Sequence, residues 1–160
     1  MTIIKEDGSI VSGANSYITV AEYEAWIDAR DLTHAGHGNV AKVEGHILRA
    51  MDWLETQSFV GLKRTKAQSL QWPRDGVMID GFAVDSTEIP QDLINALYEA
   101  TYADEREYGE MAVIDRQTKR EKVGDLEVEY MDNANSLAHS PGIYFWLRKI
   151  TVSQNMVVRV

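Results

Sequence analysis

Apolar residues recur every three or four positions along several stretches of this 160-residue chain, which is the spacing of helices that bury one face. Three stretches predict helices over about 20–30, 40–57 and 90–109. The first follows the sequence of a capping box, in which Thr19 and Glu22 each bind a backbone amide of the helix start. Pro90 suits the first turn of the third. The predicted faces are Tyr23, Trp26 and Ile27; Val43, Ile47, Ala50, Met51 and Leu54; and Leu93, Ile94, Leu97, Ala100, Thr101 and Asp104.

Two segments lack a helical period. Residues 2–18 are predicted to be extended, with a turn at Asp7-Gly8. Residues 59–86 show no sustained pattern, and a loop of this length inside a domain is usually functional or packed. Trp72 precedes Pro73 there, where an extended backbone and a large indole favour packing, so we expect Trp72 in the core.

Residues 118–130 are typical of a β-hairpin, because Gly124-Asp125 suits a two-residue turn. This register pairs Val123 with Leu126, Lys122 with Glu127, Arg120 with Glu129 and Lys119 with Tyr130. Two pairs of opposite charge then face each other across the strands, which supports the assignment.

After a polar loop, a short helix is predicted to begin at Ser140-Pro141, with Ile143, Trp146, Leu147 and Ile150 on one face. The last five residues read as an extended tail. We therefore predict a mainly α protein with a compact helical bundle core, a small β-hairpin and extended N- and C-terminal segments. It forms a single domain over 1–160, with a core at about 19–110, a hairpin at about 118–130 and a C-terminal helix and tail at about 140–160.

The charge of the chain is acidic and uneven. The formal net charge is −9, which disfavours a general DNA-coating role because phosphates are repelled. Residues 85–110 hold eight acids and one base, whereas residues 56–74 hold four bases and no acid. Ordinary solvated surface explains this pattern, and so does head-to-tail packing of identical subunits.

No catalytic, metal or cofactor site is predicted. The chain has no cysteine and none of the phosphate-binding, nucleophile-elbow or zinc-protease motifs, so we expect no enzyme. His34 and His37 have a metal-ligand spacing, with Asp31 and His46 nearby, but they lie in a glycine-containing loop and are interpreted as surface histidines. The chain also has no apolar run long enough to span a membrane and no secretory signal at its start.

One basic segment is a candidate for binding single-stranded nucleic acid. Aromatic rings beside cations can form a stacking platform for single strands. That segment contains Phe59, Lys63, Arg64, Lys66, Trp72 and Arg74. The expected burial of Trp72 and the net charge argue against this interpretation.

Several short signatures follow one another in a fixed order: Glu6-Asp7-Gly8, Ala14-Asn15-Ser16-Tyr17, Gln71-Trp72-Pro73-Arg74, Ile89-Pro90 and Lys122-Val123-Gly124-Asp125-Leu126. As an ordered set covering most of the chain, they resemble the head–tail connector (adaptor, head-completion) proteins of tailed phages. Some members of that group are labelled DnaT-like single-stranded DNA-binding proteins.

The resemblance implies a structural role for a fold signature made of Asn15, Tyr17, Trp72, Pro73 and Arg74. Asn15 is expected to cap or brace a turn, Tyr17 and Trp72 to pack together, and Arg74 to neutralise a carboxylate. The resemblance also implies a homo-oligomeric ring under the portal protein, with double-stranded DNA passing unbound through its lumen. Candidate lumen-facing acids are Glu99, Asp104 and Glu107.

The implied function is that of a connector subunit that joins portal to tail-side connector proteins, in the virion neck after assembly in the host cytoplasm. It requires no cofactor, metal or membrane. Candidate contacts with neighbouring subunits or the portal are Lys63, Arg64, Lys122, Leu126, Met156, Val158 and Val160. The alternative is a single-stranded DNA-binding replication accessory protein, and a weaker third is a toxin–antitoxin or regulatory binding module.

Overall fold

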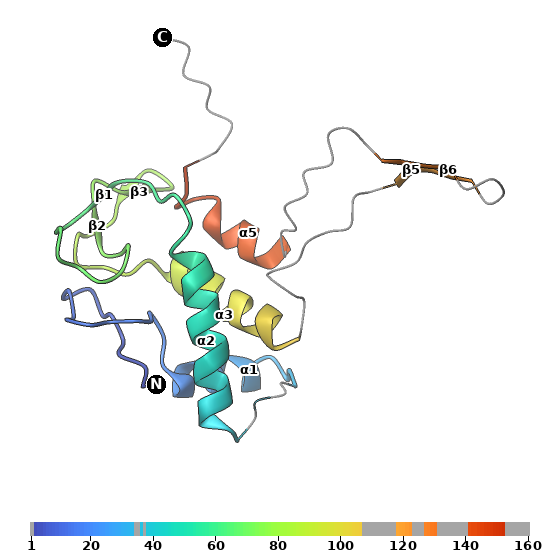
Figure 1. Ribbon diagram of the computed structural model, residues 1–160. Coiled ribbons are helices and arrows are strands. Elements are labelled where there is room, and N and C mark those ends of the chain that lie inside the picture. Colours follow the sequence, from blue (N-terminus) through green and yellow to red (C-terminus); the bar gives the residue numbers. More distant parts are fainter. Residues whose placement is uncertain are drawn as a thin grey trace, which may run out of the picture.

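Helix α3 lies at the centre of the molecule, and both α2 and α5 pack against it (Figure 1). The computed structural model describes residues 2–33, 36, 38–106, 118–122, 127–130 and 141–152. These residues form four helices: α1 (Val20–Asp28), α2 (Val40–Leu54), α3 (Gln91–Glu105) and α5 (Pro141–Leu147). The strands are β1 (Leu62–Lys63), β2 (Arg74–Asp75), β3 (Met78–Ile79), β4 (Phe82–Ala83), β5 (Thr118–Lys122) and β6 (Glu127–Tyr130).

The first two helices follow the predicted patterns closely. The Thr19 hydroxyl accepts from the Glu22 amide at 3.2 Å, and the Glu22 carboxylate accepts from the Thr19 amide at 2.8 Å, so the capping box is confirmed. The predicted faces of α1 and α2 are both buried. Each helix ends two or three residues earlier than predicted, at Asp28 and Leu54.

Helix α3 differs from its prediction at both ends. Pro90 is the residue before the helix, not part of its first turn, and the helix ends at Glu105. The buried face also includes Ala96, Ala103 and Glu105, while Ile94 is only half-buried. Glu105 is buried because its carboxylate accepts a hydrogen bond of 3.0 Å from the Tyr23 hydroxyl of α1.

The segment predicted to be a packed loop contains two small antiparallel sheets, β1–β2 and β3–β4. Leu62 faces Asp75 in the first, and Ile79 faces Phe82 in the second. Two-residue strands carry no measurable period, which is why the sequence pattern does not show them. The sheets lie close together: a Cβ on Gly61 would come within 2.6 Å of the Val77 side chain.

Strands β5 and β6 form the predicted hairpin. The pairings of Lys122 with Glu127 and of Arg120 with Glu129 are confirmed. The pairing of Lys119 with Tyr130 is wrong, because an irregularity before Arg120 places Thr118 opposite Tyr130. Val123 and Leu126 lie outside the described residues.

Helix α5 and the residues after it return the chain to the small sheets. Ile143, Leu147 and Ile150 are buried as predicted, and Trp146 is half-buried. Thr151 then pairs antiparallel with Phe59, with hydrogen bonds of 3.0 Å from the Val60 amide to the Ile150 carbonyl and 2.8 Å from the Val152 amide to the Ser58 carbonyl. The predicted tail at 156–160 lies outside the described residues.

The N-terminal segment folds back on itself around the Glu6-Asp7-Gly8 signature. The buried Glu6 carboxylate accepts hydrogen bonds from the amides of Gly8, Ile10 and Val11 at 2.8–3.0 Å. Gly8 has a φ of +100°, and a Cβ there would lie 1.7 Å from the Thr87 carbonyl oxygen. The turn therefore requires both a carboxylate at position 6 and glycine at position 8.

Candidate interaction surface

The fold signature forms a buried polar link between the N-terminal segment, α2 and the 59–86 segment. Trp72 is fully buried, and its ring meets Phe59 edge to face at a centroid distance of 5.9 Å. Its backbone amide donates to the Tyr17 hydroxyl at 3.1 Å, which in turn donates to the Glu55 carboxylate at 2.7 Å. The predicted association of Tyr17 with Trp72, and the burial of Trp72, are both confirmed.

Glu55 extends this link from the end of α2. One carboxylate oxygen accepts from Tyr17 and the other accepts from the Gln71 amide at 2.8 Å. Burial raises the pKa of Glu55, and these two hydrogen bonds partly oppose the rise. Burial also raises the pKa of Tyr17 well above its ordinary value, so the phenol stays a hydrogen-bond donor.

Arg74 fixes the loop before β1, because its buried guanidinium binds the carbonyls of Phe59, Val60 and Gly61 at 3.4, 2.7 and 2.7 Å. It also binds the backbone and side-chain oxygens of Gln71 at 3.2 and 3.0 Å. Burial lowers the pKa of Arg74, and the charge of Glu55 opposes this. The resemblance implies that Arg74 neutralises a nearby carboxylate. In the structure its hydrogen bonds go to carbonyl oxygens and to Gln71, and the charge of Glu55 acts on it without a hydrogen bond.

Asn15 braces the N-terminal segment as expected. Its side-chain oxygen accepts from the Ile4 amide at 2.8 Å, and its side-chain nitrogen donates to the Thr2 carbonyl at 3.2 Å. Pro73 is buried beside Trp72. All five signature residues thus maintain the fold. Because Phe59, Trp72 and Arg74 are buried, they cannot form the exposed stacking platform considered for single strands.

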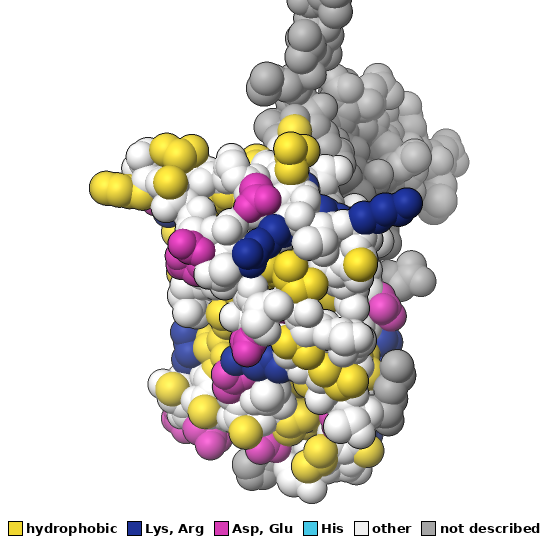
Figure 2. Space-filling model, turned by 90° about the vertical axis from the view of Figure 1, so that its left-hand side faces the viewer, with side chains coloured by type: hydrophobic (Ala, Val, Ile, Leu, Met, Phe, Trp, Pro, Cys, Tyr) yellow, Lys and Arg dark blue, Asp and Glu magenta, His cyan; other side chains and the backbone are white. Residues whose placement is uncertain are grey.

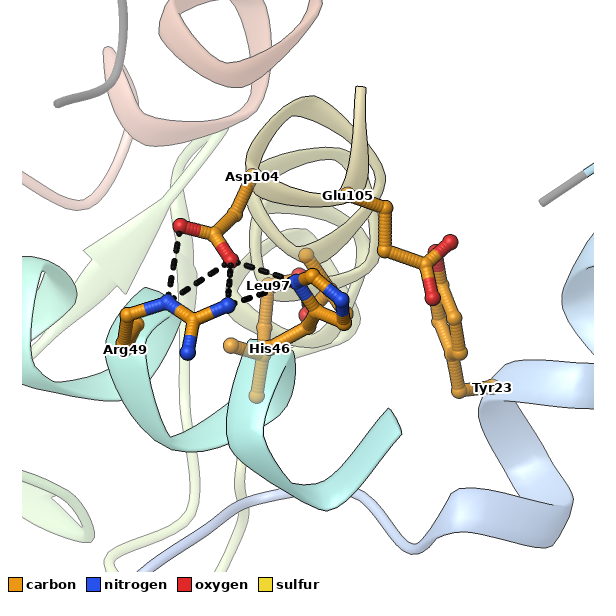
Figure 3. Close-up of polar contacts among 7 residues, drawn as sticks. Tyr23, His46, Arg49, Leu97, Asp104 and Glu105 are labelled. Carbon is orange, nitrogen blue, oxygen red and sulfur yellow. Dashed lines mark hydrogen bonds and ion pairs between the residues drawn. The ribbon is translucent and has the colours of Figure 1, made fainter. Parts of the chain in front are cut away.

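The carboxylate of Asp104, a candidate lumen-facing acid, binds side chains of the same chain (Figure 3). It accepts from the Arg49 guanidinium at 2.7–3.2 Å and lies 2.7 Å from Nδ1 of His46. Both partners come from α2, so the cluster ties α2 to the end of α3. The charge of Asp104 is therefore compensated locally.

The other two candidate acids differ from Asp104 in their surroundings. Glu99 is half-buried, and burial raises its pKa, opposed by the charge of Arg30. It lies against the start of α5, since a Cβ on Gly142 would come within 3.2 Å of its carboxylate. Glu107 lies outside the described residues.

Exposed side chains on the two small sheets include both apolar and basic residues. Leu62, Met78 and Phe82 are 75, 57 and 78% exposed. Met78 and Phe82 lie on opposite faces of the β3–β4 sheet, because Met78 faces Ala83 and Phe82 faces Ile79. Lys63 of β1 is exposed, and so are Arg64 and Lys66 after it. Figure 2 shows separate groups of hydrophobic side chains at the upper left and upper centre of the view, with Lys and Arg nearby. Sequence reasoning identified the basic residues but missed Met78 and Phe82, whose exposure depends on the turn between β3 and β4.

A second cluster that sequence reasoning missed joins α1 to α3. The ring of Trp26 stacks on Tyr98 at a centroid distance of 5.4 Å, and the Arg30 guanidinium lies 4.2 Å from the Trp26 ring centre. The spacing of Trp26 and Arg30 by four residues is the signal that could have indicated this contact. Trp26 is only 8% exposed, so the cluster is mainly a packing contact between helices.

Among the described residues, no three His, Asp or Glu side chains gather in a way that could hold a metal ion. His34 and His37 lie outside the described residues, and His46 binds Asp104. No helix in the described part of the chain has both the length and the apolar character of a membrane span.

Comparison with known proteins gives one match. A family model described as "Putative DnaT-like ssDNA binding protein" matches residues 1–160. No curated protein and no solved structure matches the chain significantly. Because the family model covers the whole sequence, the chain belongs to this DnaT-like family.

Proposed function

We propose that this protein is a structural subunit of a phage head–tail connector ring, which joins the portal protein to the tail and leaves a lumen for DNA. The observation that carries the proposal is the hairpin β5–β6. In the described part of the chain these strands pair only with each other, and Figure 1 draws them apart from the helices. A lone two-stranded hairpin is marginally stable in water, so a partner surface is expected to stabilise it.

The signature residues support the same proposal. The ordered motifs that resemble those of the connector proteins supply Tyr17 and Trp72, which form a buried hydrogen-bonded link with Glu55. They also supply Asn15, which braces the N-terminal segment. Such residues preserve a fold, and they leave the exposed segments to meet partners. In this proposal Lys122 and Leu126 of the hairpin region belong to the contacts with a neighbouring subunit or the portal.

A lumen for DNA would be formed by acidic surface. The net charge of −9 and the acids of residues 85–110 would repel phosphates and allow the duplex to pass. Asp104 contributes little to this electrostatic repulsion, because the Arg49 guanidinium compensates its negative charge. Glu99 and Glu107 remain the proposed lumen-facing acids. The assembled ring would lie in the virion neck.

The deciding experiment is electron microscopy of the purified protein mixed with the portal protein of its own phage. We expect a ring of this chain on one end of the portal. A matched pair of variants tests the hairpin: Lys122→Glu with Leu126→Ser should abolish the ring, whereas Lys42→Glu, at an exposed position of α2, should not. If the unmodified protein forms no ring and does not bind the portal, the connector function is excluded.

Single-stranded DNA binding is a second candidate, favoured by the family description and by the exposed cations Lys63, Arg64 and Lys66. Phe82, on the other small sheet, is exposed as well, and an exposed aromatic ring can stack on a base. A gel shift at about 150 mM salt, where non-specific contacts weaken, tests it. Micromolar or tighter binding that Lys63→Glu, Arg64→Glu and Lys66→Glu abolish, and Lys42→Glu does not, would favour this function over the connector.

A further inference from the structure

We infer that two copies of this chain pair through the outer face of α5, which docks in a groove beside β4 of the other copy. Each copy supplies one such face and one such groove, so the same contact forms twice. The inference goes beyond the proposed connector function, because it concerns the free chain and requires neither the portal protein nor DNA.

The outer face of α5 combines two large aromatic rings with a cation. Tyr144 and Phe145 are 53 and 47% exposed, and Arg148 is exposed one helical turn after Tyr144. The Arg148 guanidinium lies 4.7 Å from the centre of the Phe145 ring, so the cation and the ring form one continuous surface. The opposite side of α5 is buried through Ile143 and Leu147. Aromatic residues and arginine are the side chains enriched at the centres of protein interfaces.

The groove lies where the β3–β4 sheet meets the start of α3, and its volume is about 250 Å³. Ile79 and Phe82, which face each other across the two strands, both line it, and Phe82 is 78% exposed. Its charged side chains are the carboxylates of Glu88 and Asp92. Within the described part of the chain no basic side chain lines it, so the groove is both apolar and negatively charged.

The groove and the α5 face adjoin each other on the same molecule. Lys149, next to Arg148 in the chain, binds Asp80 in the turn between β3 and β4 at 2.7 Å. Asp80 and, more weakly, Asp92 of the groove raise the pKa of Lys149. When a twofold axis passes between two adjoining surfaces, the face of each copy meets the groove of the other. This arrangement therefore favours a closed pair over an open chain of molecules.

The two surfaces are complementary in charge as well as in apolar character. Arg148 and Glu88 are both exposed, and neither forms an ion pair within the described residues. In the pair, Arg148 of one copy meets Glu88 of the other, and Phe145 packs against Phe82. Opposite charges across an interface select the partner and its orientation, and the buried rings supply the apolar contribution.

Sedimentation velocity of the protein alone tests this pairing by charge exchange. The natural protein should approach twice its mass of 18.1 kDa as its concentration rises. Arg148→Glu and Glu88→Arg should each raise the Kd of the pair about tenfold or more, because each places like charges at both contacts. An equimolar mixture of the two variants should pair again, since both contacts of the mixed pair then join opposite charges. Lys42→Glu and Asp52→Arg, at exposed positions of α2, are the matched controls and should pair like the natural protein.

A second variant probes the apolar part of the contact. Phe145→Ser changes no charge and alters an exposed side chain, so its melting temperature should stay that of the natural protein while its pairing weakens. Normal pairing of this variant would overturn the inference. Restored pairing in the mixture of charge variants would support it and would show that both variants are folded.

Three further results would overturn the inference: a natural protein that stays a monomer or forms assemblies larger than a pair, association that neither charge variant weakens, or folded charge variants that stay unpaired when mixed. These results leave the connector function standing, because the portal experiment tests that function separately. Conversely, a protein that pairs as inferred but never binds the portal refutes only the connector function.

Discussion

Replacing Tyr17 by phenylalanine should destabilise the fold and should do so in a pH-dependent way. The substitution keeps the buried ring and removes only its hydroxyl. That hydroxyl accepts from the Trp72 amide at 3.1 Å and donates to the Glu55 carboxylate at 2.7 Å. A buried amide left without a partner costs about 1–3 kcal/mol, and the lost bond to a charged group is of similar size. Because the two losses share one atom, we expect a total of about 2–4 kcal/mol near neutral pH.

The pH dependence follows from Glu55. Burial raises its pKa above the ordinary value of 4.5, so the folded state holds this proton more tightly than the unfolded state. Stability therefore falls as pH rises from 4.5 through the raised pKa. The hydrogen bond from Tyr17 opposes the rise in pKa, and Tyr17→Phe removes that opposition. The difference in unfolding free energy between the two proteins should thus be largest above the raised pKa of Glu55 and smaller below pH 4.5.

Urea unfolding followed by tryptophan fluorescence measures this difference at each pH. Tyr98→Phe is the matched control, because Tyr98 is half-buried and its hydroxyl makes no hydrogen bond within the described residues. The control should stay within about 0.5 kcal/mol of the natural protein. A loss below about 1 kcal/mol for Tyr17→Phe, or a loss that does not change with pH, would refute the proposed link.

Three further outcomes are expected. Trp72→Ala should lower the free energy of unfolding by about 3–5 kcal/mol in the same assay, and a variant that unfolds like the natural protein would place the indole at the surface. Gly8→Ala should lower the melting temperature measured by circular dichroism, since its Cβ would lie 1.7 Å from the Thr87 carbonyl oxygen; an unchanged value would contradict the turn geometry. Deleting residues 154–160 should leave that temperature nearly unchanged and prevent ring formation, and either unfolding or normal assembly would argue against a role of the segment in assembly.

The helices and their buried faces were determined by the sequence itself. The signals that specify a helix lie close together in the sequence. The capping box at Thr19 and the apolar spacing of α2 each involve residues a few positions apart, and both appear as predicted. Part of the hairpin register was readable for the same reason: the pairs Lys122–Glu127 and Arg120–Glu129 are as predicted, whereas an irregularity before Arg120 places Thr118 opposite Tyr130. The burial of Trp72 followed from its place before proline in a segment without a surface pattern.

Contacts between distant segments were decided only by the tertiary structure. Nothing near Asp104 in the sequence indicates that Arg49 and His46, more than fifty residues away, will bind it. The hydrogen bonds of Arg74 to the carbonyls of residues 59–61, more than ten residues away, are likewise absent from the local sequence pattern. The exposure of Leu62, Met78 and Phe82 also arises from the fold, since strands of two residues carry no pattern and the exposure of Phe82 depends on how β3 and β4 pair.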